Sequence, residues 1–356
     1  MDRALIAMSG GVDSSVAALL SLRQGYECVG CTMKLHDDPA ETVKDSHTCC
    51  TLDDVEDARS VAFKLGMKFY VFNFQDGFRE KIIDKFIRCY ECGMTPNPCI
   101  DCNRYMKFDK LFERARVLDC STIVTGHYAR IVRKDGRFAL LKAADETKDQ
   151  SYVLYQLTQD QLAHISFPLG DLSKQETRRL AEENGFINSH KPDSQDICFV
   201  PDGNYAEVIK KLTGKDYPEG DFVDKDGNFL GRHKGIIHYT IGQRKGLEIA
   251  LGRPMYVVAL DVKNNRVVLG DNEDLFKSTL TASDFNYIPG LMPSGPFRCT
   301  AKVRYKHPEQ PATAGIMEDG RVKVTFDQPQ RAITPGQAVV LYDGDEVLGG
   351  GTIISN

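Results

Sequence analysis

Apolar and polar positions alternate along the first half of the chain in a way that predicts strands and helices in turn. Short apolar runs that fit buried strands occur at residues 4–8, 27–34, 68–74 and 121–125. Amphipathic stretches between them predict a first helix from about residue 16 and further helices at 53–65, 76–90 and 103–117. This order predicts an α/β domain in which helices cover a parallel sheet.

The pattern changes after Asp202, where helical periodicity fades and Gly, Asp and Asn turns separate short β-runs. Runs at 256–260 and 266–269 are expected to pair across Asn264-Asn265, and later runs at 298–305, 321–326 and 337–342 are typical of a small barrel. We therefore predict an α/β domain at residues 1–205, a small β-rich domain at 206–278 and a C-terminal β-barrel at 279–356.

Composition narrows the class of protein. The chain of 356 residues is 42% hydrophobic and 27% charged, which is typical of a soluble globular protein. It has no run long enough for a membrane span and no signal-peptide layout, so we expect a cytoplasmic protein without a membrane partner. The net charge of −5 leaves only local clusters to attract a polyanion.

Eleven cysteines are an odd number, which argues against a complete disulfide framework. In a reducing compartment they are expected to be buried, catalytic or metal-binding. Cys28 and Cys31 lie three apart on a predicted strand, where side chains point to opposite faces, so we predict that both fill the core.

The first turn carries the clearest chemistry. Ala7-Met8 ends the strand, Ser9-Gly10-Gly11 forms the turn, and Val12-Asp13-Ser14-Ser15 leads into the helix. Glycines let the backbone approach an anion, and the first N–H groups of a helix point toward it. The hydroxyl groups of Ser9, Ser14 and Ser15 add donors, and Asp13 can orient a Mg²⁺ ion held by phosphates.

This turn lacks the lysine of a kinase-type P-loop and the glycine spacing of a dinucleotide fingerprint. Ser-Gly-Gly-Val-Asp-Ser-Ser instead resembles the PP-loop of the ATP pyrophosphatase superfamily. That resemblance implies that ATP is split between its α and β phosphates to adenylate a carbonyl oxygen. Met33 ends the second predicted strand, at the sheet edge where the adenine is expected.

Further candidate residues follow along the chain. Cys99 and Cys102 lie in a proline-containing loop at 93–104, and we expect Cys102 at the start of the next helix, a position that favours a thiolate. Gly126-His127 follows a predicted strand, where both a structural and a functional role remain open. Residues 148–154 are expected to begin a helix with a polar head, and 193–200, which hold Cys198, to form a short strand.

Together these blocks resemble the bacterial-type tRNA-uridine 2-sulfurtransferases. The matching segments run in family order through nearly the whole chain: 9–15, 95–103, 125–130, 148–154, 193–199, 303–308 and 332–342. The resemblance implies ATP-dependent replacement of the C2 oxygen of the wobble uridine by sulfur, in the tRNAs for Lys, Glu and Gln. It also implies a persulfide or sulfide donor protein, such as a cysteine desulfurase or a sulfur relay protein.

The same resemblance assigns roles by position. Cys198 matches the residue that receives the persulfide, and Cys102 matches the nucleophile that releases sulfur and pairs with Cys198. The nucleotide site comprises residues 7–15 with Met33 and Gly126. The positions that match tRNA contacts are Asn97, Pro98, Cys99, His127, Lys148, Asp149, Gln150, Arg304, Tyr305 and Gln337. Lys302, Lys306 and His307 extend a basic run around Tyr305, which is suited to phosphates and base stacking.

Cys99 departs from the family, in which many members carry Asp at this position. With Cys102 and Cys198 it gives three thiolates, which can hold a [4Fe–4S] cluster with one open iron. We therefore consider a sulfide-carrying cluster as a second route, and Cys89 and Cys92 as partners of Cys99 and Cys102 in a zinc knuckle.

Two other classes of function remain open. A different PP-loop adenylating enzyme, such as an amidotransferase-type synthetase acting on a small carboxylate, would not need Cys102 or Cys198. An RNA-binding protein with a degenerate nucleotide site is the non-enzyme alternative, and the intact Asp13 and Ser14 argue against it.

Overall fold

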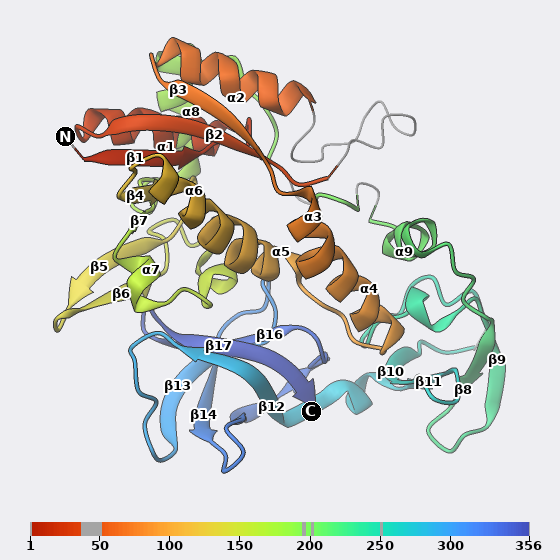
Figure 1. Cartoon of the computed structure of the whole chain (residues 1–356). Coiled ribbons are helices and arrows are strands. Elements are labelled where there is room, and N and C mark those ends of the chain that lie inside the picture. Colours follow the sequence, from red (N-terminus) through yellow and green to blue (C-terminus); the bar gives the residue numbers. More distant parts are fainter. Residues whose placement is uncertain (1, 37–51, 194–196, 201–202, 250–251, 356) are drawn as a thin grey trace.

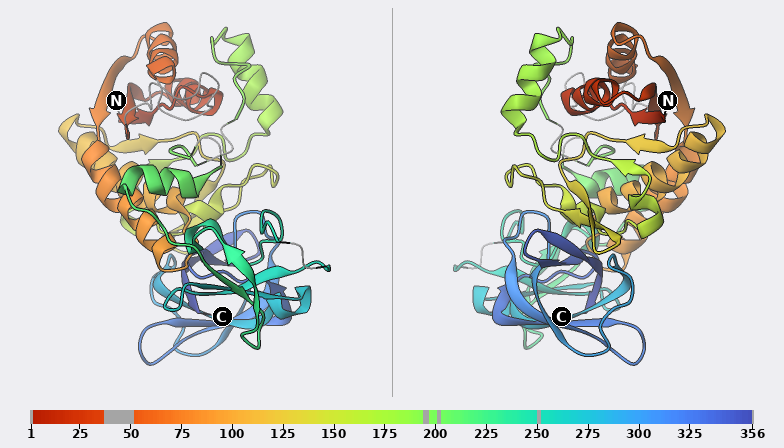
Figure 2. Two further views of the ribbon diagram at one scale, coloured as in Figure 1. Left: turned by 90° about the vertical axis from the view of Figure 1, so that its right-hand side faces the viewer. Right: turned by 90° about the vertical axis from the view of Figure 1, so that its left-hand side faces the viewer.

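The computed structural model describes residues 2–36, 52–193, 197–200, 203–249 and 252–355. Figure 1 places a parallel sheet with its helices at the top, a β-barrel at the bottom and a small β-rich unit at the right. Both side views in Figure 2 show the barrel beneath the α/β part. None of the described helices is long and apolar enough to cross a membrane.

The parallel sheet has the strand order β3-β2-β1-β4-β7, with strands β1 (Arg3–Ala7), β2 (Glu27–Lys34), β3 (Lys68–Asn73), β4 (Thr122–Val124) and β7 (Ile165–Ser166). Every neighbouring pair is parallel, as the alternating pattern predicts. The order reverses at β1, between β2 and β4. Ligands of open α/β sheets bind at such a reversal, at the carboxyl ends of the strands.

Helices cover both faces of this sheet. One face packs against α1 (Val12–Arg23), α2 (Leu52–Lys64) and α8 (Lys174–Glu183), around apolar residues that include Ile6, Val16 and Val61. The other face packs against two long helical segments. The first comprises α3 (Gln75–Phe78), a π-helical stretch (Arg79–Ile83) and α4 (Asp84–Glu91), and the second comprises α5 (Pro98–Asp101), a π-helical stretch (Cys102–Lys110) and α6 (Leu111–Val117). Cys28 and Cys31 are buried on opposite faces, which confirms the prediction that they fill the core.

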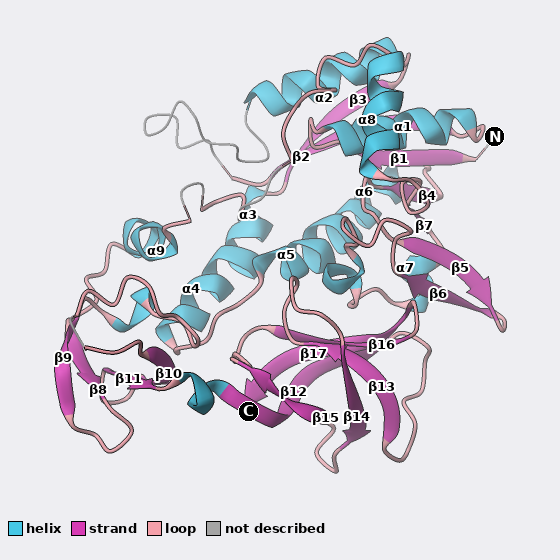
Figure 3. Ribbon diagram, turned by 180° about the vertical axis from the view of Figure 1, so that it is seen from behind, coloured by secondary structure: helices cyan, strands magenta, loops and turns pink. Residues whose placement is uncertain are grey.

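The middle of the chain joins the α/β part to the barrel. After α9 (Tyr205–Thr213), a four-stranded sheet contains β8 (Gly220–Val223), β9 (Phe229–His233), β10 (Tyr256–Asp261) and β11 (Arg266–Gly270), with a 3₁₀ turn at Ile236–His238. The last two strands pair across Asn264-Asn265, as predicted, and Asn265 has a φ of +50°. In Figure 3 this unit and the barrel appear mostly as strands, whereas the upper part is mostly helical.

Six strands close the barrel: β12 (Phe276–Tyr287), β13 (Phe297–Lys302), β14 (Gln310–Ile316), β15 (Val322–Arg331), β16 (Ala338–Asp343) and β17 (Glu346–Ser355). A hairpin from the first half, β5 (Arg130–Lys134) and β6 (Arg137–Leu141), adds to this sheet through the pairing of Leu141 with Glu346. The hairpin turns at Asp135-Gly136, both with positive φ, and Asp-Gly is a favoured pair for such a tight turn. The barrel is thereby tied to the α/β part.

Two local predictions in this region are wrong. Residues 148–154 form no helix beyond a single 3₁₀ turn, η3 (Ser151–Leu154), which precedes the one-turn helix α7 (Gln159–Leu162). Residues 197–200, with Cys198, form a turn rather than a strand, and 194–196 lie outside the described residues. Polar side chains of 148–150 bind other parts of the fold, and Phe199 packs against Phe78 and Phe86, so tertiary contacts rather than local periodicity decide these backbones.

Barrel stability offers a test with a matched control. Leu341 is fully buried in the barrel core, whereas Leu291 is 98% exposed. Leu341→Ala should cost about 2–5 kcal/mol through lost burial and a residual cavity. Leu291→Ala should change stability by less than about 0.5 kcal/mol. Calorimetric unfolding of the two variants measures this, and equal melting temperatures would contradict the assigned core.

Candidate functional site

The turn between β1 and α1 has the backbone of an anion cradle. α1 begins at Val12 with Gly11 as its N-cap, and no side chain caps its first N–H groups. Gly10 has a φ of +75°, and a Cβ there would lie 2.3 Å from the carbonyl oxygen of Asp54. Gly126, after β4, lies against the start of α1, since its Cβ would come 2.8 Å from the backbone of Asp13 and Ser14. Only glycine fits either position without moving the turn.

The serine hydroxyl groups have separate roles. Those of Ser14 and Ser15 donate to the Gly11 carbonyl oxygen at 3.0 and 3.1 Å, and both side chains are buried. Ser9 is exposed at the mouth of the turn. Asn188, which the sequence analysis missed, donates from Nδ2 to the Gly10 carbonyl and to Ser15 Oγ, both at 2.9 Å. The buried serines therefore shape the turn, and Ser9 is the hydroxyl accessible to a ligand.

Lys174 connects this turn to the rest of the site. Its Nζ lies 2.7 Å from Asp13 Oδ1 and 2.7 Å from Asp193 Oδ1. The Tyr128 hydroxyl also donates to Asp13 Oδ1, at 2.9 Å. Sequence analysis missed Lys174, although one signal was available: it is the first residue of α8, where the helix dipole disfavours a cation unless an anion compensates.

Asp193 forms ion pairs with three cations. Lys148 Nζ lies 2.8 Å from Oδ2, and Arg178 Nη2 lies 3.1 Å from Oδ1, beside Lys174. Burial alone would raise the pKa of Asp193, but the hydrogen bonds from Lys148 and Lys174 outweigh it and hold the pKa below its usual value. The two carboxylates, Asp13 and Asp193, thus face three cations, Lys148, Lys174 and Arg178. The excess of positive charge is suited to phosphate groups.

The predicted tRNA contacts at 148–150 each bind a different part of the fold. Lys148 reaches Asp193, as described above. The Asp149 carboxylate is almost buried and accepts from Ser151 and from the Ala143 N–H, and its carbonyl accepts from the Tyr305 hydroxyl at 3.0 Å. Gln150 exchanges two hydrogen bonds with the backbone of Tyr128, each 2.9 Å long. This segment therefore connects the nucleotide turn, the barrel and the loop after β4.

His127, one of the positions that match tRNA contacts, is buried in this structure. It is 6% exposed, and its Nδ1 lies 2.6 Å from Thr125 Oγ1 while its Nε2 lies 3.3 Å from Lys107 Nζ. Burial, followed by the Lys107 charge, holds the pKa of His127 far below its ordinary value. A neutral ring accepts from Lys107 and donates to Thr125, so in this structure His127 supports the loop from beneath its surface.

The helix position predicted for Cys102 is wrong. The helix begins at Pro98, with Asn97 as the N-cap whose Oδ1 accepts from the Cys99 N–H at 3.2 Å. Proline is tolerated at the first helical position because its missing N–H would have no partner there. Exposed Cys99 therefore occupies the first turn, and half-buried Cys102 begins the π-helical stretch one turn later. π-helical stretches are often found at functional sites.

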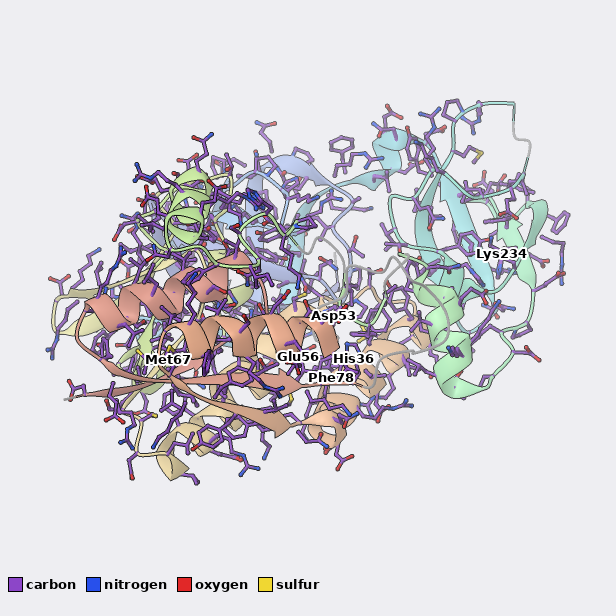
Figure 4. The ribbon with its side chains drawn as sticks, turned by 90° about the horizontal axis from the view of Figure 1, so that it is seen from above. His36, Asp53, Glu56, Met67, Phe78 and Lys234 are labelled. Carbon is purple, nitrogen blue, oxygen red and sulfur yellow. The ribbon has the colours of Figure 1, made fainter. Side chains whose placement is uncertain are left out.

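The segments that carry Cys102 and Cys198 meet around α3. Phe199 packs edge-on against Phe78 with ring centres 5.8 Å apart, while a Cβ on Gly77 would lie 3.5 Å from Met106, four residues after Cys102. Cys102 and Cys198 both contact the apolar core beneath this face of the sheet. Figure 4 labels Phe78 beside His36, which follows β2.

Cys198 cannot lie far from Asp193, because only five residues of chain separate them. Asp193, which is bound to Lys174, lies five residues before Cys198, so their Cα atoms are at most about 18 Å apart. Met33, near the carboxyl end of β2, packs against the same core. Met8 is buried, and Ala7 ends β1 directly before the turn. The structure thus brings the predicted nucleotide residues to one edge of the sheet.

The predicted metal sites find no support. Among the residues that the structure describes, no group of three or more His, Cys, Asp or Glu side chains is arranged to hold a metal ion. Cys99, Cys102 and Cys198 therefore form no ligand set for a [4Fe–4S] cluster, and Cys89, Cys92, Cys99 and Cys102 form no zinc knuckle. Cys89 is buried in α4 and Cys92 ends it exposed, which separates the two thiols.

The predicted tRNA-contacting residues of the barrel lie in turns rather than on the face of a strand. β13 ends at Lys302, so Arg304 and Tyr305 lie beyond it, and Tyr305 is 38% exposed. Burial, then the charges of Asp149 and Cys99, raise the pKa of Tyr305, which places Cys99 near this ring. Gln337 donates to the carbonyl oxygens of Thr95 and Pro96 at 2.9 and 3.4 Å, and so holds the loop before Cys99 against the barrel.

Comparison with known proteins gives a consistent family. Three family models match in sequence: a tRNA methyl transferase HUP domain at residues 2–202, a tRNA methyl transferase PRC-barrel domain at 206–271 and an aminomethyltransferase beta-barrel domain at 277–353. A solved 4-thiouridine synthetase–RNA complex with bound ATP aligns over 60% of this chain and 50% of its own, with a TM-score of 0.39 and 17% identity.

Curated relatives agree over the full length. The chain is 52% identical to the tRNA-specific 2-thiouridylase MnmA of Clostridioides difficile (strain 630), over 99% of this chain and 98% of the relative. It is 51% identical to the protein of the same name from Acetivibrio thermocellus, over 99% of both chains. With such identity along nearly its whole length, the chain belongs to the tRNA-specific 2-thiouridylase (MnmA) family.

Proposed function

We propose that this protein replaces the C2 oxygen of the wobble uridine by sulfur in the tRNAs for Lys, Glu and Gln, at the expense of ATP. Family membership supports the thiolation of tRNA. The ion pairs from Asp13 through Lys174 to Asp193 carry the proposal, because they connect the phosphate cradle to the segment that holds Cys198.

The nucleotide turn is suited to ATP. Phosphates would accept from the N–H groups at the start of α1 and from Ser9, close to Lys174, Lys148 and Arg178. Mg²⁺ would be held by the phosphates and by Asp13, and would neutralise charge as pyrophosphate leaves. The uracil O2 attacks the α-phosphate, and the adenylated oxygen then becomes a good leaving group.

Sulfur transfer follows at C2. The terminal sulfur of a persulfide on Cys198 attacks C2 and displaces AMP. Cys102, as thiolate, attacks Sγ of Cys198, breaks the bond to the transferred sulfur and forms a disulfide with Cys198. The product keeps its sulfur at C2, and an external thiol reductant regenerates the two cysteines. The persulfide itself is supplied by a donor protein.

The target base must leave the anticodon stack to reach these groups. We place the target base next to the start of α5, which comprises Asn97, Pro98 and Cys99. The exposed ring of Tyr305 is a surface on which a base can stack. His127, Asp149, Gln150 and Gln337 act from beneath by holding the loops, since each binds backbone or buried side chains.

Thiolation by the purified protein tests this proposal. Unmodified tRNA is incubated with ATP, Mg²⁺ and a persulfide source, and its nucleosides are measured by mass spectrometry. Cys102→Ser and Cys198→Ser should each reduce 2-thiouridine at least 100-fold, yet retain tRNA-dependent pyrophosphate release, because adenylation precedes sulfur transfer. Exposed Cys92→Ser is the control. Wild-type yield from Cys198→Ser would overturn the persulfide role.

Two glycines with similar backbone φ angles allow a test of whether the turn after β1 binds ATP. Gly10 and Gly25 both have positive φ, but a Cβ meets Asp54 only at Gly10, since nothing lies within 4 Å at Gly25. Gly10→Ala should therefore raise the dissociation constant of ATP about tenfold or more, for a displacement that costs at least ~1.4 kcal/mol. Gly25→Ala should leave ATP binding unchanged. Calorimetric titration decides, and equal affinities would place ATP elsewhere.

A further inference from the structure

Two hydrogen-bond donors converge on one oxygen of the Asp13 carboxylate. Lys174 Nζ lies 2.7 Å from Oδ1, and the Tyr128 hydroxyl donates to the same atom at 2.9 Å. Among the residues that the structure describes, both contacts of this carboxylate go to Oδ1, and the Asp13 side chain is 31% exposed. One oxygen is therefore fixed by the protein, while Oδ2 remains available to a ligand.

Tyr128 is held in place by the core and by its own backbone. It follows Gly126-His127, is 2% exposed and packs in the apolar cluster beneath α1 and α8. Its N–H donates to Gln150 Oε1 and its carbonyl oxygen accepts from the Gln150 N–H, both at 2.9 Å. Because ring and backbone are both fixed, the hydroxyl group defines where Asp13 Oδ1 lies.

The phenol proton of Tyr128 goes to the carboxylate. The hydroxyl has two oxygen neighbours, Asp13 Oδ1 at 2.9 Å and Thr177 Oγ1 at 3.0 Å, but only one proton to donate. A carboxylate is the stronger acceptor, because a hydrogen bond to a charged group is shorter and stronger than one between neutral groups. Thr177 Oγ1 also bonds to the Ser173 carbonyl at 3.1 Å. The contact with Asp13 is therefore the stronger of the two.

The available oxygen of Asp13 fits a magnesium ion that is shared with a bound nucleotide. In such sites the protein supplies one or two carboxylates, and the phosphates and water supply the other oxygen ligands. Asp13 is the second residue of α1, beside the N–H groups that face an anion. The described residues contain no group of three or more ligating side chains. Metal binding at this turn would therefore depend on how this one carboxylate is oriented.

We propose that Tyr128 is a positioning residue for nucleotide-bound Mg²⁺, whose hydroxyl group fixes Asp13 Oδ1 and leaves Oδ2 for the ion. This inference rests on the proposed function for the use of ATP and Mg²⁺. Lys174 contacts the same oxygen, but it also binds Asp193, and phosphates compete for its charge. Tyr128 is neutral and buried, so its contact with Asp13 is retained when an anion draws Lys174 away.

Binding of ATP with and without Mg²⁺ tests this role in the absence of tRNA and sulfur. Calorimetric titration of the full chain gives the dissociation constant of ATP in excess Mg²⁺ and again in EDTA. Tyr128→Phe keeps the buried ring and removes only the hydroxyl group. It should raise the dissociation constant of Mg²⁺–ATP about tenfold, as expected when a metal-binding carboxylate loses a hydrogen-bond partner. The dissociation constant of metal-free ATP should not change, whereas a general distortion of the turn would raise both.

Tyr152→Phe is the matched control. Tyr152 is fully buried, and its hydroxyl group donates to the carbonyl oxygen of Ala338, in the barrel, at 2.9 Å. Both variants lose one buried hydrogen bond, so the melting temperature should fall in both. Only Tyr128→Phe should also lose affinity for Mg²⁺–ATP.

A double variant shows whether Tyr128 acts through Asp13. Asp13→Asn removes the charge that would hold the ion, and should weaken Mg²⁺–ATP binding more than Tyr128→Phe does. Adding Tyr128→Phe to Asp13→Asn should then cause no further loss, because residues in direct contact are not additive when one acts through the other.

Three results would overturn the inference. These are unchanged Mg²⁺–ATP affinity in Tyr128→Phe, an equal loss of affinity for Mg²⁺–ATP and metal-free ATP, and a further tenfold loss in the double variant. Normal thiolation by the wild type together with any of these results refutes the role of Tyr128 alone. The selective loss of Mg²⁺–ATP affinity, with no 2-thiouridine formed by the wild type, refutes only the proposed function.

Discussion

The two ion pairs of Lys174 hold together segments that are far apart in the chain. Asp13 belongs to the first helix, Lys174 to α8 and Asp193 to the segment that leads to Cys198. Lys174 is 9% exposed, so removing either carboxylate would leave a buried charge poorly compensated. One ammonium group therefore links the turn after β1 directly to the segment that leads to Cys198.

Residues 148–150 extend this constraint to the barrel. Lys148 shares Asp193 with Lys174, Asp149 accepts from Tyr305, and Gln150 binds the backbone beside His127. The three consecutive residues therefore connect the segment of Asp193, the barrel and the loop after β4. The β5–β6 hairpin and Gln337 add two further attachments between the same parts.

Local sequence signals predicted much of the fold but less of the site. The parallel sheet and the pairing of β10 with β11 across Asn264-Asn265 follow from periodicity and turn chemistry. The start of the helix at Pro98 did not, because proline breaks a helix in its interior but is tolerated at the first helical position, here after the Asn97 cap. The burial of His127 depends on Lys107 and Thr125, contacts that no local pattern reveals.

The two basic regions of the molecule differ in how their charges are balanced. At the nucleotide turn Lys148, Lys174 and Arg178 are all paired with carboxylates, so an incoming polyphosphate must compete with Asp13 and Asp193 for them. In the cavity between α9, the middle β-unit and the barrel, Arg304 and Arg331 have no such competitor among the described residues. A polyphosphate at the turn would therefore rearrange the network that leads to Cys198. On the proposed function, nucleotide binding at the turn is therefore the step expected to change the position of the segment that holds Cys198.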